Sequence, residues 1–289
     1  MYFLKDAKVQ DIKRLLELFP ATILRNKWSG VKGTKEEICF AAASEQDIPK
    51  ITNFLNDHLS CCKQHIYIFS HDTPLNSLPV FTIQDGEEIF KDSTEKRTRK
   101  LYIVKLKYNV VLKDPLEEAV LEFLLPICLD FIEQHLIVKF VTHEKSIGSY
   151  FEGRSYYMDS RSTDEKAILQ ILNNAMGEHL LPTDLHKGVK KLWEDGFMDS
   201  PKTQYKKAIS TSSEAMDEDK GIKEFYPEIY ATVSDSLLLS ALFIVTPRKD
   251  GFSVTAFSME PSKGTINFPR YSDRPGDTDY VVNEILRHN

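Results

Sequence analysis

The pattern of hydrophobic and polar positions changes character near residue 60 of this 289-residue chain. Before that point, apolar residues recur every three or four positions, which is typical of amphipathic helices. Pro20 marks a helix end, and Thr34, followed three residues later by Glu37, forms the capping-box pattern of a helix start. From His65 onward, apolar and polar residues alternate, which predicts strands. We therefore expect a small helical module followed by a sheet.

The stretch from residue 101 to 143 predicts a strand, a helix and a second strand. Residues 101–108 alternate apolar and polar side chains, as a half-buried strand does. Asp114-Pro115 with Glu117 has the composition of a helix start, and residues 119–132 are apolar on nearly every side, which predicts a helix deep in the core. Residues 136–141 predict the return strand. Since a crossover of this length suits a parallel pair, the stretch predicts a β-α-β unit with right-handed connection.

The rest of the chain predicts an alternation of strands, helices and polar connections. Ahead of the β-α-β unit we expect strands at residues 65–71 and 78–84 and a charged connection at 91–100. After it, the expected elements are helices at 167–176 and 185–193, a loop at 210–221, a helical piece at 222–226, strands at 237–246, 252–259 and 265–268, and a helix at 280–286.

These elements predict a mixed α+β fold in three parts. The first part is a helical module at residues 1–60, and the second is a domain at 61–158 whose central mixed sheet contains the β-α-β unit. The third is a C-terminal α+β domain at 159–289 with an antiparallel hairpin, whose turn signal is Asp250-Gly251.

Composition places the chain among ordinary globular proteins, with 42% hydrophobic and 28% charged residues. A net charge of -6 argues against a uniformly basic nucleic-acid binder but not against a local basic patch. No segment approaches the roughly 20 apolar residues of a membrane-spanning helix, and the N-terminus lacks signal-peptide features. The four cysteines are not spaced as a disulfide frame. We expect no membrane partner and a cytoplasmic location, or a nuclear one in a eukaryote.

Basic residues are concentrated in the helical module. Ahead of the helix that starts near Thr34 they outnumber the acidic residues, and they are Lys5, Lys8, Lys13, Arg14, Arg25, Lys27, Lys32 and Lys35. The start at Gly33-Thr34-Lys35 would present backbone N–H groups to a phosphate. The turn from Gly30 to Lys35 resembles that of helix-extension-helix DNA-binding modules of the SAP type. The alternative is an ordinary capped helix with a solvated cationic face.

A second basic cluster, which consists of Lys96, Arg97, Arg99 and Lys100, precedes the strand that starts at residue 101. It could extend an anion-binding face, or it could protect a strand edge from pairing. Together, the two clusters give the candidate nucleic-acid-binding residues Arg25, Lys27, Lys32, Lys35, Lys96, Arg97, Arg99 and Lys100.

Patterns for metal binding or catalysis are weak. The possible metal ligands are His58, Cys61, Cys62, His65 and His71 in one group, and Asp273, Asp277 and Asp279 in another. A structural zinc site needs four ligands in two separated pairs, and the acidic group also fits a simple helix start. Glu218-Asp219-Lys220 has nuclease-like spacing, whereas phosphate-loop, GxGxxG and GxSxG patterns do not occur. We therefore expect no catalytic residue, metal or cofactor.

The order of elements resembles a known family. A basic helical module, two strands, a third strand, a long apolar helix and the return strand with Ile137-Val138-Lys139 resemble the layout of the centromere protein N family of kinetochore subunits. That resemblance implies DNA and histone-surface binding through Arg25, Lys27 and Lys32. We expect a non-enzymatic protein that binds double-stranded DNA with its N-terminal half and protein with its acidic C-terminal half. The alternatives are a metal-dependent nuclease or nucleotide-processing enzyme, and a pure assembly subunit.

Overall fold

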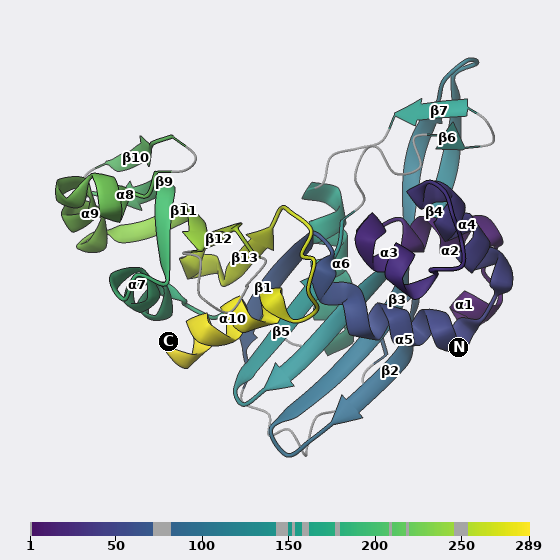
Figure 1. Ribbon diagram of the computed structural model, residues 1–289, viewed down its shortest axis with the longest axis horizontal. Helices are drawn as coiled ribbons and strands as arrows, with labels where there is room; N and C mark the ends of the chain where they lie inside the picture. The colour runs from purple at the N-terminus through teal and green to yellow at the C-terminus, as the bar shows by residue number, and fades with distance from the viewer. Residues whose placement is uncertain are drawn as a thin grey trace.

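The fold is α+β, as the sequence predicts, with helices packed on a large antiparallel sheet (Figure 1). The computed structural model describes residues 2–71, 82–142, 150–151, 154–157, 162–176, 180–207, 210–217, 220–245 and 254–289. Within these ranges, no helix is both long and apolar enough to cross a membrane.

The N-terminal module consists of short helices, as predicted. They are α1 (Tyr2–Lys5), α2 (Val9–Leu16), α3 (Ala21–Lys27), α4 (Lys35–Glu45) and α5 (Ile48–His58), followed by the 3-10 turn η1 (Leu59–Cys61). The predicted capping box is confirmed. The backbone N–H of Thr34 donates to Glu37 Oε2 at 2.6 Å, and that of Glu37 donates to Thr34 Oγ1 at 3.3 Å. The rings of Phe19, Phe54 and Trp28 pack together in the interior of the module.

Strands from all parts of the chain join one sheet. They are β1 (Gln64–Ser70), β2 (Gly86–Ser93), β3 (Arg97–Leu112), β4 (Glu117–Ile132), β5 (His135–Phe140), β6 (Tyr150–Phe151), β7 (Arg154–Tyr157), β8 (Leu181–Pro182), β9 (Met198–Lys206), β10 (Thr211–Ala215), β11 (Leu237–Val245), β12 (Ala256–Glu260) and β13 (Thr265–Phe268). The order is β10-β9-β11-β12-β13-β1-β5-β4-β3-β7-β6, with β2 beside β3 and β8 beside β1.

The predicted helix at 119–132 is wrong, because this stretch is strand β4. It pairs with β3 in a long antiparallel hairpin that runs from Arg97 opposite Ile132 to Leu112 opposite Glu117. Asp114 and Pro115 lie in the turn that joins the two strands. Much of β4 is buried on both faces, so its sequence is apolar throughout and lacks the alternation that would distinguish a strand from a helix.

The β-α-β unit and its parallel pair are therefore wrong. Every strand pair in the described part of the sheet is antiparallel. The long apolar helix was also one element of the layout that resembles the centromere protein N family. That element of the resemblance is not present.

Several smaller predictions can also be compared with the structure. The expected charged connection at residues 91–100 is wrong, because β2 ends and β3 begins within it. The expected loop at 210–221 contains β10, and β9 and helix α9 (Pro227–Ser234) were not predicted. Residues 78–81 and the Asp250-Gly251 turn lie outside the described residues, while residues 82–84 are not in a strand.

Most of the remaining elements agree with the sequence. Strands β1, β5, β11 and β13 are confirmed, as are the helices α6 (Ser162–Met176), α7 (His186–Glu194), α8 (Ile222–Phe225) and α10 (Asp277–Arg287). Strands β11 and β12 form the expected antiparallel pair. The acidic group does lie at a helix start, because Asp277 and Asp279 are in the first turn of α10, whose N-cap residue is Gly276.

The two faces of the sheet are covered by different helices. Lys139 of β5 contacts Asp279 of α10, whereas Tyr67 of β1 contacts Glu165 of α6. Tyr67 lies opposite Val138 in the β1–β5 ladder, so Tyr67 and Lys139 point to opposite faces. Helix α10 therefore covers one face and α6 covers the other.

A network of charged side chains is buried where β4, β5 and α10 meet. Asp130 of β4 is fully buried, and its carboxylate contacts Lys139 Nζ at 2.6 Å and the guanidinium of Arg97 at 2.8 Å. Lys139 also contacts Asp279 at 2.6 Å, and Arg99 lies 3.8 Å from Asp130. Burial alone would raise the pKa of Asp130, but Lys139, Arg99 and Arg97 outweigh it and lower the pKa to about 2. The network joins the central strands to the last helix.

We predict that Asp130→Asn lowers the free energy of unfolding by about 3 kcal/mol at pH 7, because it removes the carboxylate shared by Arg97, Arg99 and Lys139 and leaves the buried Lys139 with Asp279 alone. Urea unfolding measures this change. The folded-state pKa of Asp130 is depressed, so its stabilisation is complete above the unfolded pKa of about 3.9 and is lost as the pH falls toward 2. The difference between wild type and variant should therefore shrink from pH 5 to pH 2. A constant difference would contradict the proposed network.

Candidate functional site

Three of the predicted DNA-binding residues are exposed and close in sequence. Arg25 and Lys27 lie in the last turn of α3, whose apolar residues Ile23 and Leu24 are buried. Lys32 lies in the loop between α3 and α4. Because the apolar residues of α3 pack inward, the basic side chains remain in solvent. Among the described residues, no carboxylate forms an ion pair with Arg25, Lys27 or Lys32.

The start of α4 differs from the phosphate site that the sequence suggests. The capping box occupies the backbone N–H groups of Thr34 and Glu37 and places the Glu37 carboxylate at the helix N-terminus. The backbone N–H of Thr34 holds the pKa of Glu37 below its ordinary value, so this carboxylate remains charged. Two of the N–H groups at this helix start are therefore already occupied, and a carboxylate stands where a phosphate was expected. Lys35 beside it is half-buried, and its Nζ donates to the carbonyl of Glu17 at 2.5 Å.

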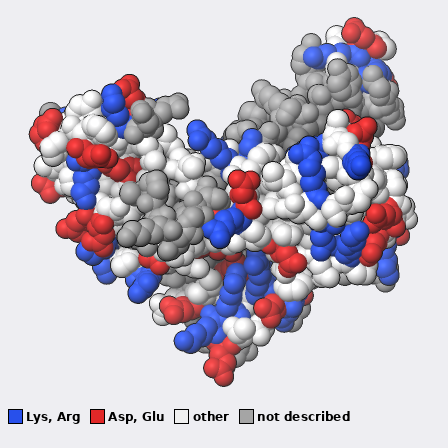
Figure 2. Space-filling view, in the orientation of Figure 1, with Lys and Arg blue, Asp and Glu red and all other residues white. Residues whose placement is uncertain are grey.

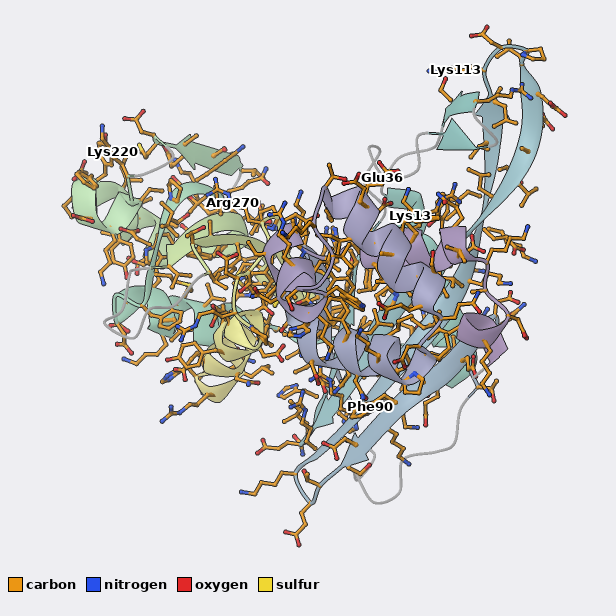
Figure 3. All side chains as sticks on the ribbon, turned by 45° about the vertical axis from the view of Figure 1, so that its right-hand side comes forward. Lys13, Glu36, Phe90, Lys113, Lys220 and Arg270 are labelled. Carbon is orange, nitrogen blue, oxygen red and sulfur yellow. The ribbon has the colours of Figure 1, made fainter. Side chains whose placement is uncertain are left out.

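Two further basic residues of the module are structural. Lys13 Nζ lies 2.5 Å from Glu36 and 3.5 Å from Glu17, and Figure 3 shows Lys13 and Glu36 side by side. The Arg14 guanidinium lies over the ring of Phe123 in β4 at 5.4 Å. Lys13 and Arg14 are both buried. Lys13 holds parts of the module together, and Arg14 attaches the module to the hairpin.

The second basic cluster has mainly internal partners. Lys96 is exposed in the β2–β3 turn, but Arg97 pairs with Asp130, and Arg99 Nε contacts Cys128 Sγ at 3.3 Å. Lys100 is buried on the other face of β3, 3.7 Å from Glu88. The β2–β3 turn also lies at the lower end of the sheet in Figure 1, away from α3. The structure therefore does not bring the two clusters onto one surface.

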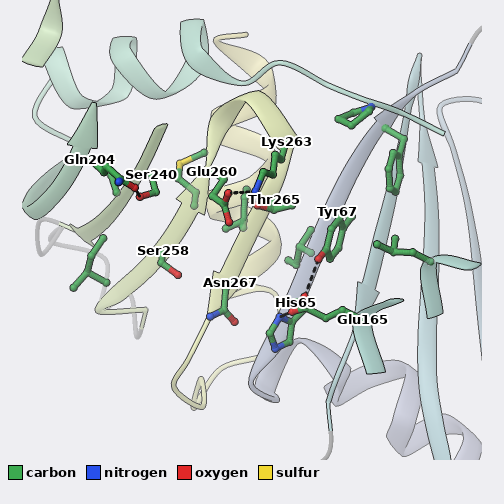
Figure 4. Close-up of a pocket in the computed structure, with 18 of the residues that line it drawn as sticks. His65, Tyr67, Glu165, Gln204, Ser240, Ser258, Glu260, Lys263, Thr265 and Asn267 are labelled. Atoms are coloured by element: carbon green, nitrogen blue, oxygen red, sulfur yellow. Dashed lines mark hydrogen bonds and ion pairs between the residues drawn. The ribbon is translucent and has the colours of Figure 1, made fainter. Parts of the chain in front are cut away.

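A groove of about 1040 Å³ lies on the sheet face that carries α6 (Figure 4). Its floor follows the ladder across strands: Asn267 lies opposite His65, and Ser258 lies opposite Asn267. Further along, Leu242 lies opposite Ser258, and Lys202 lies opposite Leu242. Hydroxyl, amide and aliphatic side chains therefore line the part of this sheet face that α6 does not cover.

A carboxylate closes one end of the groove. Glu165 of α6 lies 2.8 Å from His65 Nδ1 and accepts a hydrogen bond from the Tyr67 hydroxyl at 3.2 Å. The other ring nitrogen of His65 lies 3.3 Å from Thr142 Oγ1. Burial, followed by the charge of Glu165, raises the pKa of Tyr67, so its hydroxyl remains protonated. Both imidazole nitrogens have partners, and the arrangement holds α6 against β1 rather than presenting a base to a substrate.

Because side chains alternate along a strand, the strand expected at residues 65–71 has His65 and Tyr67 on one face, but the sequence does not indicate Glu165 as their partner. Glu165 lies about a hundred residues further along the chain than His65. Its place among the polar residues of α6 is the only local feature that separates it from the other glutamates of the sequence. The groove floor could not be predicted from the sequence either, because its residues come from strands that are far apart in the chain and pair only in the folded sheet.

The candidate metal ligands do not form a site in the described residues. No group of three or more His, Cys, Asp or Glu side chains there is placed to hold an ion. Cys61 and Cys62 are buried thiols, and burial raises the pKa of Cys61 to about 12. Asp279 is engaged by Lys139. Glu218 and Asp219 of the nuclease-like triplet lie outside the described residues.

Comparisons with protein-family models, with curated proteins and with solved structures found no match for this chain.

We predict that Glu165→Gln loosens α6 without unfolding the protein, because it weakens the contacts of this side chain with His65 and Tyr67 at the end of the groove. Hydrogen exchange in α6 should rise roughly fivefold, equivalent to about 1 kcal/mol. The matched control is Glu284→Gln on α10, whose partners Arg287 and His288 belong to the end of the same helix and its cap. Unchanged exchange in α6 of Glu165→Gln would show that this contact does not anchor the helix.

Proposed function

We propose that the protein is a non-enzymatic DNA-binding protein that docks on the phosphate backbone through its N-terminal helical module. The observation that carries the proposal is the group of Arg25, Lys27 and Lys32, which are exposed and have no carboxylate partner among the described residues. Cations that meet phosphates release counterions, so such a surface supplies affinity without reading base sequence.

The acidic residues of the module support the same proposal. Glu17 and Glu36 contact Lys13, and Glu37 is bound within its own capping box. These carboxylates are held by other partners, so they do not form ion pairs with Arg25, Lys27 and Lys32. A local basic surface can therefore exist on a chain whose net charge is -6.

A second candidate function is protein binding by the C-terminal part. The open groove favours it, because its volume of about 1040 Å³ exceeds the roughly 300–1,000 Å³ that is typical of small-molecule sites. Its floor is rich in uncharged polar side chains, and mixed polar surfaces of this kind are common in protein interfaces.

We predict that the triple variant Arg25→Glu, Lys27→Glu, Lys32→Glu weakens binding to duplex DNA on the order of 10- to 100-fold near 100 mM salt. The slope of log affinity against log salt should also fall by about 3, since each lost phosphate contact removes about 0.9. Fluorescence anisotropy with a labelled 20-base-pair duplex across a salt series measures both quantities.

The matched control is Lys187→Glu, Lys202→Glu, Lys206→Glu. These lysines are exposed on the C-terminal part and have no ion-pair partner among the described side chains, and the control changes the net charge by the same amount. The control should bind almost as tightly as wild type. Equal losses in both triple variants would mean that only net charge matters, and a wild type with a flat salt response would remove the proposal.

A further inference from the structure

The loop between β13 and α10 is held against the N-terminal module. The backbone N–H of Ser272 donates to the carbonyl of Cys61 at 3.1 Å, and that of Gly276 donates to Ser60 Oγ at 2.9 Å. Thr278 Oγ1 at the start of α10 donates to the carbonyl of Ser60 at 3.3 Å. Figure 1 shows this loop in yellow beside α3 and α5. Residues 269–276 therefore lie in a fixed position next to a segment that is more than 200 residues away in sequence.

The contact brings an aromatic ring between two lysines. The ring centroid of Tyr271 lies 5.4 Å from Lys35 Nζ and 5.0 Å from Lys63 Nζ. Lysines within about 6 Å of a ring are attracted to its face. Lys35 begins α4 and Lys63 precedes β1, so the ring holds together cationic side chains from two separate elements.

The loop also carries an exposed arginine at the edge of this cluster. Arg270 directly precedes Tyr271, is exposed, and has no ion-pair or hydrogen-bond partner among the described residues. Figure 3 shows Arg270 on the side of the C-terminal strands that faces the N-terminal helices. In Figure 2, Lys and Arg side chains, mixed with acidic ones, occupy the notch between these two parts.

We propose that the loop around Arg270 is a second DNA-contacting element, which extends the surface of Arg25, Lys27 and Lys32 across the notch onto the C-terminal part. This inference rests on the proposed function and deepens it. Arg270 binds the phosphate backbone of double-stranded DNA, and Tyr271 positions Lys35 and Lys63 between the two groups of cations.

Three observations favour a long polyanion over a single small anion. The exposed cations belong to α3, to the loop after it and to the loop before α10, so they are distributed over a surface instead of converging on one point. The loop is fixed by backbone hydrogen bonds, so Arg270 is placed for binding without a large cost of ordering. Duplex DNA carries a charge about every 1.7 Å along its axis and can meet cations on both sides of the notch at once.

One carboxylate in the same loop allows a test of opposite sign. Asp273 is exposed and has no partner among the side chains that the structure describes. If phosphates approach this loop, Asp273 repels them. Neutralising Asp273 should then strengthen binding, whereas reversing the charge of Arg270 should weaken it.

The experiment measures the affinity of the full-length protein for a labelled 20-base-pair duplex across a salt series. Arg270→Glu should weaken binding roughly three- to tenfold near 100 mM salt and lower the salt slope by about 1, the value for one lost phosphate contact. Asp273→Asn should bind more tightly than wild type by up to about threefold. Arg270→Lys should retain most of the wild-type affinity, and Lys187→Glu serves as the control for a single charge reversal. Unfolding midpoints establish that each variant is folded.

The outcomes separate this inference from the proposed function. If Arg270→Glu binds like Lys187→Glu while the Arg25, Lys27 and Lys32 triple variant loses affinity, the loop proposal fails and the proposed function stands. If wild type does not bind the duplex, both fail. Parallel titrations with duplex RNA and with phosphatidylserine vesicles test the choice of polyanion, and tighter, Arg270-dependent binding to either would overturn the assignment to DNA.

Discussion

Backbone hydrogen bonding along both edges of β1 is the interaction on which the rest of the structure depends. One edge pairs with β5 from Ser70 to His65, and the other pairs with β13 from Gln64 to Tyr67. The two pairings join the central hairpin to the C-terminal strands in a single sheet. Ile66 and Ile68 bury one face of β1 beneath the C-terminal helices, while Tyr67 faces α6. This position of β1 brings α6 over one face of the sheet, forms the floor of the groove, and places the loop before α10 against η1.

Burial of charge decides which basic residues remain available for a partner. Lys139 is paired with Asp130 and Asp279, and Lys13 is enclosed by acidic residues of its own module. A buried cation must be paired, because taking a charge out of water is costly. Arg25 and Arg270 carry the same charge but lie in solvent. A count of lysines and arginines treats these two groups alike, although only the second can meet a ligand.

The predictions that succeeded depend on short-range interactions. The capping box of Thr34 and Glu37 involves residues three positions apart, so local sequence contains all of its parts. Strand β1 shows the alternation of a half-buried strand because its two faces meet different surroundings. The prediction of a helix at β4 failed because much of this strand is buried on both faces, so both faces are apolar and the signal of period two is lost. Strand β10 was missed because it is short and polar, as strands at the edge of a sheet commonly are.

By itself, the sequence determined the α+β class, the helical module with its cap, several strands and the concentration of positive charge near the N-terminus. The tertiary structure decided the antiparallel pairing, the engagement of Arg97 and Arg99 by the buried Asp130, and the meeting of Tyr271 with Lys35 and Lys63. The physical reason is the range of the interactions. Turns, caps and periodicity arise between near neighbours, whereas strand pairing and charge compensation join residues that only the folded chain brings within a few ångströms.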